Sequence, residues 1–472
     1  MPAAVSTRNA HSGTAPGRSE ATPEKASRPA MSTLVEIIAP RRSRAVREVV
    51  DGDGGLLVGV SCHVDPSQSA ADRCPMVGAV PEGDEMSMRV VVIGGGYAGV
   101  MAANRVAASR GSTGVEVILV TAAEAFVERI RLHEHAAGAA ASATVPFSSL
   151  LHPAVRVRVC AVERIDAAER VLALAGGDRL RYDALVYAAG SRATMPEGDG
   201  VHAIADLRAA TRLRADLAIL PPGAVVAVVG GGLTAIEAAT EIAERHPSLT
   251  VRLRTGGEVA PSVAPRSRDR LRRHLARRGI GLEEHASVAT TGDVRAALGA
   301  DAVVWCTGFR GPALAADSGL PVTADGRLRV DAALAVVGGG GRVFGAGDAA
   351  VIDDDRHAHQ RMGCASALPM GAHAADNVLR VLAGETPVPF SAGFVAQCLS
   401  LGRRDGLIQA VTADDRPRRL ALTGRPAALV KEAVCRQTLR WLRGEAHRGG
   451  SYSWPRGPES AAPTTEEEGA WT

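Results

Sequence analysis

The chain has few aromatic residues and no patterned cysteines. Aromatic side chains make up 3% of its 472 residues, whereas hydrophobic residues make up 46% and there are 52 glycines. The 7 cysteines are scattered, without a C-x-x-C pair or the spacing of zinc ligands. This excludes a structural zinc module and a patterned disulfide framework. We therefore expect reduced thiols, no metal site and a core in which strands pack closely on helices.

A strong charge of one sign is also missing. With 54 basic and 51 acidic residues the net charge is +3, which gives no field for nucleic acid and predicts no nucleic-acid partner. The N-terminus lacks an apolar core of signal-peptide length, which favours a cytoplasmic location. One uncharged stretch, Leu217 to Ile236, has the length of a membrane span. Its prolines and glycines predict a loop, a buried strand and a turn instead.

Short apolar runs alternate with helix-like stretches through the middle of the chain. This pattern predicts parallel sheets covered by helices, and hence an α/β fold. The plainest strands are expected at Val90–Ile93, Val115–Val120, Ala184–Ala188, Val225–Val229, Leu249–Leu253 and Ala302–Trp305. The two ends of the chain lack such periodicity, and we expect residues 1–87 to form a disordered extension and 449–472 a disordered tail.

A glycine turn follows the first expected strand. Gly94, Gly96 and Gly99 fit G-x-G-x-x-G at the start of a helix. The first glycine permits a tight turn, the second lets the backbone approach a pyrophosphate, and the third lets helix and strand pack closely. The amides and dipole of the helix N-terminus favour the phosphates. The pattern predicts a dinucleotide site.

A second turn of the same kind occurs more than a hundred residues later. Gly230 and Gly232 repeat the glycines, and Ala235 is the permitted third small residue. Two such turns predict two dinucleotides, each in its own Rossmann-like unit.

Together with three later segments, the two turns resemble the FAD-dependent pyridine nucleotide oxidoreductases, flavoproteins with two dinucleotide-binding domains. "YDALVYAAGSRAT" (182–194) resembles the segment that leaves the FAD domain, and "ADAVVWCTGF" (300–309) resembles the return. "GRVFGAGDAA" (341–350) resembles the segment whose aspartate, here Asp348, hydrogen-bonds the ribityl chain of FAD. The resemblance extends over roughly residues 89–381 and implies bound FAD, with NADH or NADPH as electron donor.

The resemblance also implies a domain order and a set of binding residues. The NAD(P)H domain, expected at 201–308, is inserted in the FAD domain, which is expected to comprise a first segment at 88–200 and a second segment at 309–385. A C-terminal region is expected at 386–448. The residues implied for FAD are Gly94, Gly96, Gly99, Thr121, Ala189, Gly190, Gly347 and Asp348. Those implied for NAD(P)H are Gly230, Gly232, Ala235, Arg254 and Gly308.

Neither unit carries the acid that usually binds the ribose hydroxyls after the second strand. The first unit has Thr121 there, with Glu124 as a substitute, and the second has Thr255 preceded by Arg252 and Arg254. An arginine without a nearby carboxylate suits the 2′-phosphate of NADPH. A solvated strand edge explains the same arginines, so NADH and NADPH both stay open.

Disulfide reductases of this superfamily need a reactive cysteine pair beside the flavin, and no such pair is present. Cys160 and Cys364 could form a sulfide-handling pair, but single cysteines in such settings usually pack as small hydrophobes. What remains most resembles the type II NADH dehydrogenases, in which electrons leave the flavin directly for an acceptor such as a quinone. The alternatives are a reductase of a small iron–sulfur carrier and a non-catalytic flavoprotein redox sensor.

Glu237 lies on the helix that the second turn opens, where the family has a glutamate near the meeting of flavin and nicotinamide. It could relay a proton to the acceptor, or it could merely be favoured by the helix dipole. A further helix is expected to begin near Pro369 and to point its N-terminus at the flavin, with His373 as a structural residue. The basic amphipathic stretch at 428–443 favours packing on the FAD domain over peripheral contact with a membrane.

Overall fold

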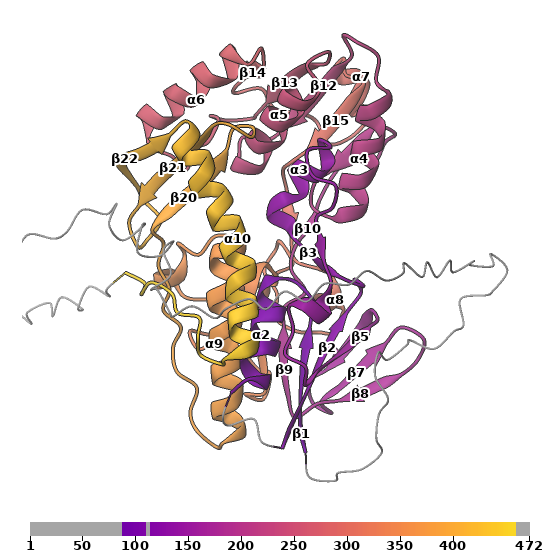
Figure 1. Ribbon diagram of the computed structural model, residues 1–472. Coiled ribbons are helices and arrows are strands. Elements are labelled where there is room, and N and C mark those ends of the chain that lie inside the picture. Colours follow the sequence, from indigo (N-terminus) through magenta and orange to yellow (C-terminus); the bar gives the residue numbers. More distant parts are fainter. Residues whose placement is uncertain (1–86, 110–113, 459–472) are drawn as a thin grey trace, which may run out of the picture. The chain divides into compact units, whose positions relative to one another are not determined.

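Two parallel sheets of five strands each form the framework of the protein (Figure 1). The computed structural model describes residues 87–109 and 114–458. The first sheet has the order β18-β9-β1-β2-β5, with β18 at Val343–Gly345, β9 at Ala184–Tyr187, β1 at Met88–Ile93, β2 at Val115–Thr121 and β5 at Val155–Val159. The second has the order β11-β15-β12-β13-β14, with β11 at Val201–Ala203, β15 at Ala302–Trp305, β12 at Val225–Val229, β13 at Thr250–Arg254 and β14 at Gly281–Glu283.

The α/β class predicted from the sequence is confirmed. All six of the expected strands lie in these two sheets, shifted at their ends by at most two residues. The uncharged stretch 217–236 contains the end of a helix, a loop, β12 and a turn, as predicted. In sequence order, four strands of the first sheet precede the strands of the second sheet, and β18 follows them. The predicted domain boundaries themselves stay predictions.

Smaller sheets surround this framework. Two are antiparallel with three strands: β6 (Val162–Asp166), β7 (Val171–Leu174) and β8 (Arg179–Arg181), and β20 (Ala396–Ser400), β21 (Gly406–Val411) and β22 (Pro417–Thr423). Three are pairs: β10 (Arg192–Ala193) with β16 (Phe309–Arg310), β3 (Phe126–Val127) with β4 (Thr144–Val145), and β17 (Leu328–Val330) with β19 (Ala350–Ile352).

The α-helices of the described residues fall into two groups by length. The long ones are α2 (Tyr97–Ala107), α4 (Leu207–Ile219), α5 (Leu233–Arg245), α6 (Pro265–Arg277), α9 (Cys364–Leu382) and α10 (Arg425–His447), of which α10 is the longest. The others are a single turn or little more: α3 (Leu132–Ala136), α7 (Val294–Ala297) and α8 (Leu314–Asp317). The helix α2 follows β1 directly after the first glycine turn, and α5 follows β12 after the second.

Small side chains decide how the helices of the first sheet pack. The helices α2 and α9 lie side by side (Figure 1), and the face of α2 is built largely of alanine and valine. At their contact a Cβ on Gly371 would lie 2.3 Å from the carbonyl oxygen of Ala98. Only glycine fits there, because no side chain can share that space with a backbone atom.

The C-terminal helix α10 packs against α2 and the β20–β22 sheet. Its buried side includes Ala427, Cys435 and Leu442, which agrees with the predicted packing of this stretch on the FAD domain. No helix among residues 87–109 and 114–458 is long and apolar enough to cross a membrane.

Two expectations differ from the structure, and one lies outside it. The helix expected near Pro369 begins at Cys364, so that Pro369 lies inside it; proline is most common at the first helical position, which misled the sequence reading. The first residues of the expected disordered tail are packed, since Tyr452 is buried beside Trp441 and Trp454. The expected N-terminal extension lies outside the described residues, except for its last one.

We expect Asn104→Ala to lower the free energy of unfolding by about 2–4 kcal/mol, because it leaves buried backbone groups without partners. The amide of the fully buried Asn104 donates to the carbonyl oxygens of Leu150 and Leu442, and its oxygen accepts from the backbone N–H of His152. Urea unfolding checks this, with Arg440→Ala on exposed α10 surface as the control, expected to change stability by less than about 0.5 kcal/mol. Equal effects of the two variants would contradict it.

Candidate functional site

The first glycine turn has the geometry of a dinucleotide site. Gly94 has a φ of 106°, and a Cβ there would lie 2.2 Å from the carbonyl oxygen of Ala188. A Cβ on Gly99 would lie 1.8 Å from the carbonyl oxygen of Gly94, which closes the helix onto the turn. A Cβ on Gly96 would meet nothing within 4 Å. Two glycines therefore serve the packing of the turn, and Gly96 leaves open space for a ligand at the start of α2.

The second turn repeats this division. Gly230 has a φ of 139°, and a Cβ there would lie 3.0 Å from the carbonyl oxygen of Cys306. Gly232 again faces open space, while Ala235 is fully buried where helix and strand pack. In each turn the middle glycine of the motif thus faces open space.

A cavity of about 250 Å³ lies where the two units meet. It begins at the first turn with Gly96 and reaches Thr234 in the first turn of α5. Of the residues predicted from the sequence, the cavity is lined by Gly96, Gly190, Glu237, Gly347 and Asp348. It is also lined by His133, Cys364 and Lys431. The sequence predicted no role in a flavin site for His133 or Lys431, and for Cys364 it offered only the sulfide alternative.

Asp348 holds together two segments that line the cavity. Its Oδ1 accepts a 2.7 Å hydrogen bond from the backbone N–H of Gly363, which precedes α9. Its Oδ2 accepts a 3.0 Å bond from the hydroxyl of Ser191 and lies 3.9 Å from Nη1 of Arg129. The carboxylate thus fixes the N-terminus of α9 at the cavity wall, where the helix dipole is positive.

The other predicted residues of the FAD set lie close to the first turn. Thr121 ends β2 and is buried, and its hydroxyl would lie 2.9 Å from a Cβ on Gly95. Ala189 is adjacent to Gly94, whose Cβ would lie 3.1 Å from its Cα. Glu124 is exposed. These positions fit the expected first unit, although Thr121 and Ala189 do not line the cavity.

None of the residues predicted for NAD(P)H, which are Gly230, Gly232, Ala235, Arg254 and Gly308, lines this cavity, although Gly308 directly precedes Phe309, which does. Gly308, with a φ of 71°, immediately precedes β16 in the β10–β16 pair that connects the two large sheets. Arg254 ends β13, and its Nη1 lies 3.5 Å from the carboxylate of Glu283. The carboxylate of Glu283, which the sequence did not predict here, therefore lies beside Arg254, the arginine proposed for a 2′-phosphate.

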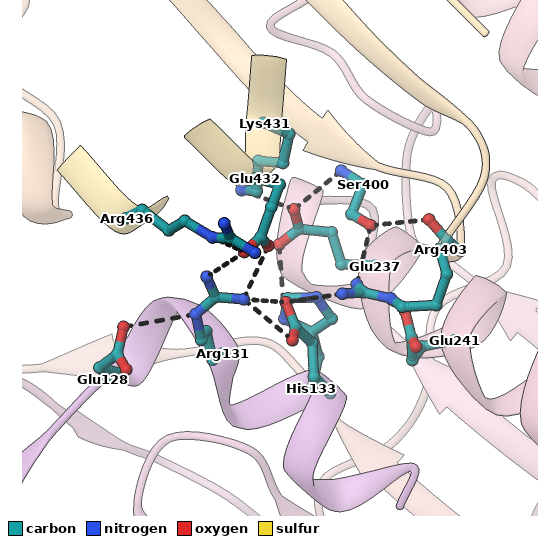
Figure 2. A network of polar contacts seen from close by, with 12 residues as sticks. Glu128, Arg131, His133, Glu237, Glu241, Ser400, Arg403, Lys431, Glu432 and Arg436 are labelled. Carbon is teal, nitrogen blue, oxygen red and sulfur yellow. Dashed lines mark hydrogen bonds and ion pairs between the residues drawn. The ribbon is translucent and has the colours of Figure 1, made fainter. Parts of the chain in front are cut away.

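Glu237 forms a buried ion pair with Lys431 of α10 (Figure 2). The distance from Nζ to Oε1 is 2.9 Å, and the same oxygen accepts a 3.0 Å bond from the backbone N–H of Ser400. Burial raises the pKa of Glu237, but Lys431, His133 and the Ser400 amide outweigh it and hold that pKa below its usual value. Burial lowers the pKa of Lys431, and Glu237 reverses this, so that its pKa is raised. Both groups are charged at neutral pH.

Arginines extend this pair into a network of charges (Figure 2). Arg131 lies 3.0 Å from the carboxylate of Glu432 on α10 and 3.1 Å from that of Glu134 on α3. Arg403, which follows β20, lies 3.1 Å from Glu134 and 2.9 Å from Glu241 of α5. Three elements that are distant in sequence are thereby fixed around the cavity.

The cysteines and His373 do not form a redox or acid–base group. Cys364 is a free thiol that lines the cavity, whereas Cys160 is packed in the core of the first sheet and does not line it. Burial raises the pKa of Cys364, so its sulfur is a poorly reactive thiol at neutral pH. His373 is structural, as expected, because its Nε2 bonds the carbonyl oxygen of Val388 at 2.8 Å.

The sequence did not predict that Lys431 and His133 belong to the site. Lys431 lies in a stretch whose other basic residues are on the surface, and His133 lies in a short helix without periodicity. No local signal distinguishes either residue, because both depend on contacts with an element far along the chain.

Known proteins resemble this chain in sequence. The family model of the pyridine nucleotide-disulphide oxidoreductases matches residues 88–375. An NADH dehydrogenase-like protein of Mycobacterium tuberculosis is 32% identical over 383 residues, which are 73% of this chain and 92% of that protein. The type II NADH:quinone oxidoreductase of Staphylococcus epidermidis is 27% identical over 410 residues, 75% of this chain and 96% of that protein.

Solved structures share the fold. The sulfide:quinone oxidoreductase of Aquifex aeolicus superposes with a TM-score of 0.64 at 19% identity, covering 76% of this chain and 92% of that one. At this identity the likeness extends to the fold alone.

We expect Lys431→Met to lower the free energy of unfolding at pH 7 by about 3–5 kcal/mol, because it leaves the Glu237 carboxylate buried and unpaired. Without the lysine, burial dominates and raises the pKa of Glu237 above its unfolded value. A carboxyl group whose pKa is raised by folding destabilises the fold as the pH rises above its pKa in the unfolded chain. The loss of unfolding free energy relative to wild type should therefore be smaller at pH 5 than at pH 7. Urea unfolding at both pH values measures it.

The double variant Lys431→Met with Glu237→Leu is the control for this experiment. It removes both charges, so most of the lost stability should return. A deficit that stays the same at both pH values and in the double variant would show that the pair is not the cause.

Proposed function

Because the chain belongs to the pyridine nucleotide-disulphide oxidoreductase family, we propose that it oxidises NAD(P)H through bound FAD and passes the electrons directly to a quinone. The family membership makes the chain an NAD(P)H oxidoreductase. The individual cofactors, the residues that hold them and the acceptor are the proposal.

A single observation carries the proposal: the first glycine turn and the first turn of α5, the helix that the second glycine turn opens, line one cavity, and the same cavity is lined by an ion pair rather than by a pair of thiols. Gly96 lines it from the first turn and Thr234 from α5, together with Glu237 and Lys431. A hydride can be received from one dinucleotide by the other only where the two binding sites meet. The charged wall then borders the place where an acceptor must collect electrons.

The residues of the first sheet fit FAD. The space at Gly96 admits a pyrophosphate at the N-terminus of α2, and Asp348 borders the cavity with a carboxylate that can accept from a ribityl hydroxyl. The N-terminus of α9, held by Asp348 through Gly363, presents backbone amides that stabilise negative charge on a reduced ring. When bound, FAD would accept a hydride and release two electrons.

The residues of the second sheet fit NAD(P)H. The space at Gly232 admits the second pyrophosphate at the N-terminus of α5. The neighbouring Arg254 and Glu283 favour different cofactors, because the arginine suits a 2′-phosphate and the carboxylate suits ribose hydroxyls. Arg254 therefore favours NADPH only if its ion pair with Glu283 breaks when the cofactor binds.

A quinone is the acceptor that the site supports best. Burial raises the pKa of Cys364, and it raises that of Cys435, another thiol close to Lys431, to about 12. Neither offers the thiolate that a disulfide or persulfide route needs. A quinone takes protons as well as electrons, and Glu237 lies at the cavity wall with Lys431 to hold its charge. The Staphylococcus epidermidis relative is named for the reduction of quinones.

The two glycines that face open space provide a matched test of the cofactor assignment. We expect Gly96→Val to give folded protein without flavin, because the added side chain meets ligand rather than protein. Gly232→Val should retain flavin and lose its bleaching by NADH and NADPH. Absorbance at the flavin band and rapid mixing with either cofactor measure both effects. The same phenotype in the two variants would contradict the assignment.

We expect Glu237→Gln to slow quinone reduction by about a hundredfold, the usual range for a lost proton donor. The reaction with ferricyanide, which takes electrons without protons, should be much less affected. The ratio of the two rates, recorded with pre-reduced protein in rapid mixing, isolates the proton-dependent step.

Other acceptors give distinct results in the same experiment. Fast, salt-sensitive electron transfer to a small iron–sulfur protein together with slow quinone reduction would replace the quinone by a protein carrier. Absence of turnover with every acceptor would leave a redox sensor.

A further inference from the structure

His133 lies within 4 Å of two carboxylates, of which Figure 2 shows that of Glu237. Its Nδ1 is 3.9 Å from Oε2 of Glu237, and its Nε2 is 3.9 Å from Oε1 of Glu134. The side chain is 3% exposed, and Nε2 has no hydrogen-bond partner within the part of the chain that the structure describes. A buried ring nitrogen without a partner is uncommon and needs an explanation. Packing alone gives none, because an apolar side chain would fill the same space without this penalty.

The histidine also lies between two cavities. The inner one, where the two glycine turns meet, is lined by His133 and Glu237. An outer one of about 430 Å³ is lined by Glu134 and by Arg403 and Leu429, of which Leu429 is 72% exposed. Lys431 lines both cavities, but its ammonium group is held by Glu237. Glu134 and His133 are neighbours on α3, so a second connection from the outer cavity to Glu237 runs through these two side chains.

The proposed reaction needs such a path. The oxidation of NAD(P)H by a quinone consumes one further proton, since NAD(P)H, a proton and the quinone give NAD(P)⁺ and the quinol. The hydride supplies two electrons and one of the two protons of the quinol. The second proton must cross the protein from solvent in every turnover. This step rests on the function proposed above.

We propose that His133 carries this proton from Glu134 to Glu237. The O–H bond of protonated Glu134 breaks as an N–H bond forms at Nε2, and the N–H bond at Nδ1 breaks as an O–H bond forms at Oε2 of Glu237. Glu237 then gives its proton to an oxygen of the quinone. No electrons move through the relay, and rotation of the imidazole ring, which turns its new N–H bond toward Glu237, readies it for the next proton.

The surroundings of His133 suit this role. The charged groups that face it are Glu134 on its own helix, Glu237 on α5, Lys431 on α10 and Arg403 after β20. Burial lowers the pKa of His133 despite the two carboxylates, so the ring is neutral and has a lone pair for a proton. Each 3.9 Å gap closes to hydrogen-bond length with a movement of about 1 Å.

The same helix offers a matched control. His135, two residues further on, is also buried and also has one ring nitrogen, Nδ1, without a hydrogen-bond partner among the described residues. Its Nε2, however, lies 3.0 Å from the hydroxyl of Thr211 on α4 and not beside a carboxylate. It does not line the inner or the outer cavity. A substitution there disturbs α3 to a similar extent without touching the path.

The test compares His133→Ala, His133→Gln and His135→Ala after reduction by NAD(P)H. Each reduced protein is mixed rapidly with a water-soluble quinone and, separately, with ferricyanide. We expect both His133 variants to lower the ratio of the quinone rate to the ferricyanide rate by about tenfold or more. Added imidazole should restore the ratio in His133→Ala, which leaves a cavity for it, and the ratio in His135→Ala should match wild type.

Other outcomes overturn the proposal and separate it from the function on which it rests. If the His133 variants keep the wild-type ratio, or lose both rates equally without rescue by imidazole, the histidine is structural. When Glu237→Gln lowers the ratio but the His133 variants do not, only the relay fails. When Glu237→Gln leaves the ratio unchanged, or the wild type reduces no quinone, the proposed proton chemistry fails and the relay with it. Flavin content and circular dichroism of each variant, with His133→Gln as the near-isosteric substitution, exclude loss of the fold as the cause.

Discussion

The ion pair between Glu237 and Lys431 is the contact on which the cavity depends. It connects α5, the first helix after the second glycine turn, with α10 at the C-terminal end of the fold. Moving two charges out of water is unfavourable, and it is offset here only because the geometry is close and Ser400 adds a backbone hydrogen bond. Any shift of α10 therefore leaves a charge uncompensated. The wall of the site is therefore held by electrostatics in addition to the apolar packing of α10.

This electrostatic wall also determines what chemistry the cavity can support. The thiols closest to it, those of Cys364, Cys398 and Cys435, all have pKa values raised by burial, although Lys431 opposes the effect. The positive charge of the lysine is already balanced by Glu237 and is not available to stabilise a thiolate. The site therefore holds a stable carboxylate and unreactive thiols, which is the reverse of what a disulfide reductase requires.

The cofactor end of the site could be predicted from sequence because its signals are local. Gly94, Gly96 and Gly99 act within a few residues of each other, and the structure gives each a distinct steric reason. The acceptor end could not, because Lys431 and His133 matter only through contacts that the fold creates. Glu237 shows the limit of prediction from sequence. Its place on α5 could be predicted from the glycine turn before it, but its partners Lys431 and His133 could not.

The two ends of the site are therefore built by different segments of the chain. The glycine turns belong to the parallel sheets, and their geometry suits any dinucleotide. The acceptor end is built from α3, α10 and the segment after β20, and these supply His133, Lys431 and Arg403. Cofactor binding can stay constant while these segments vary, because neither turn contacts the charged network except through α5. The charges around Glu237 thus come from these three segments and not from the two turns.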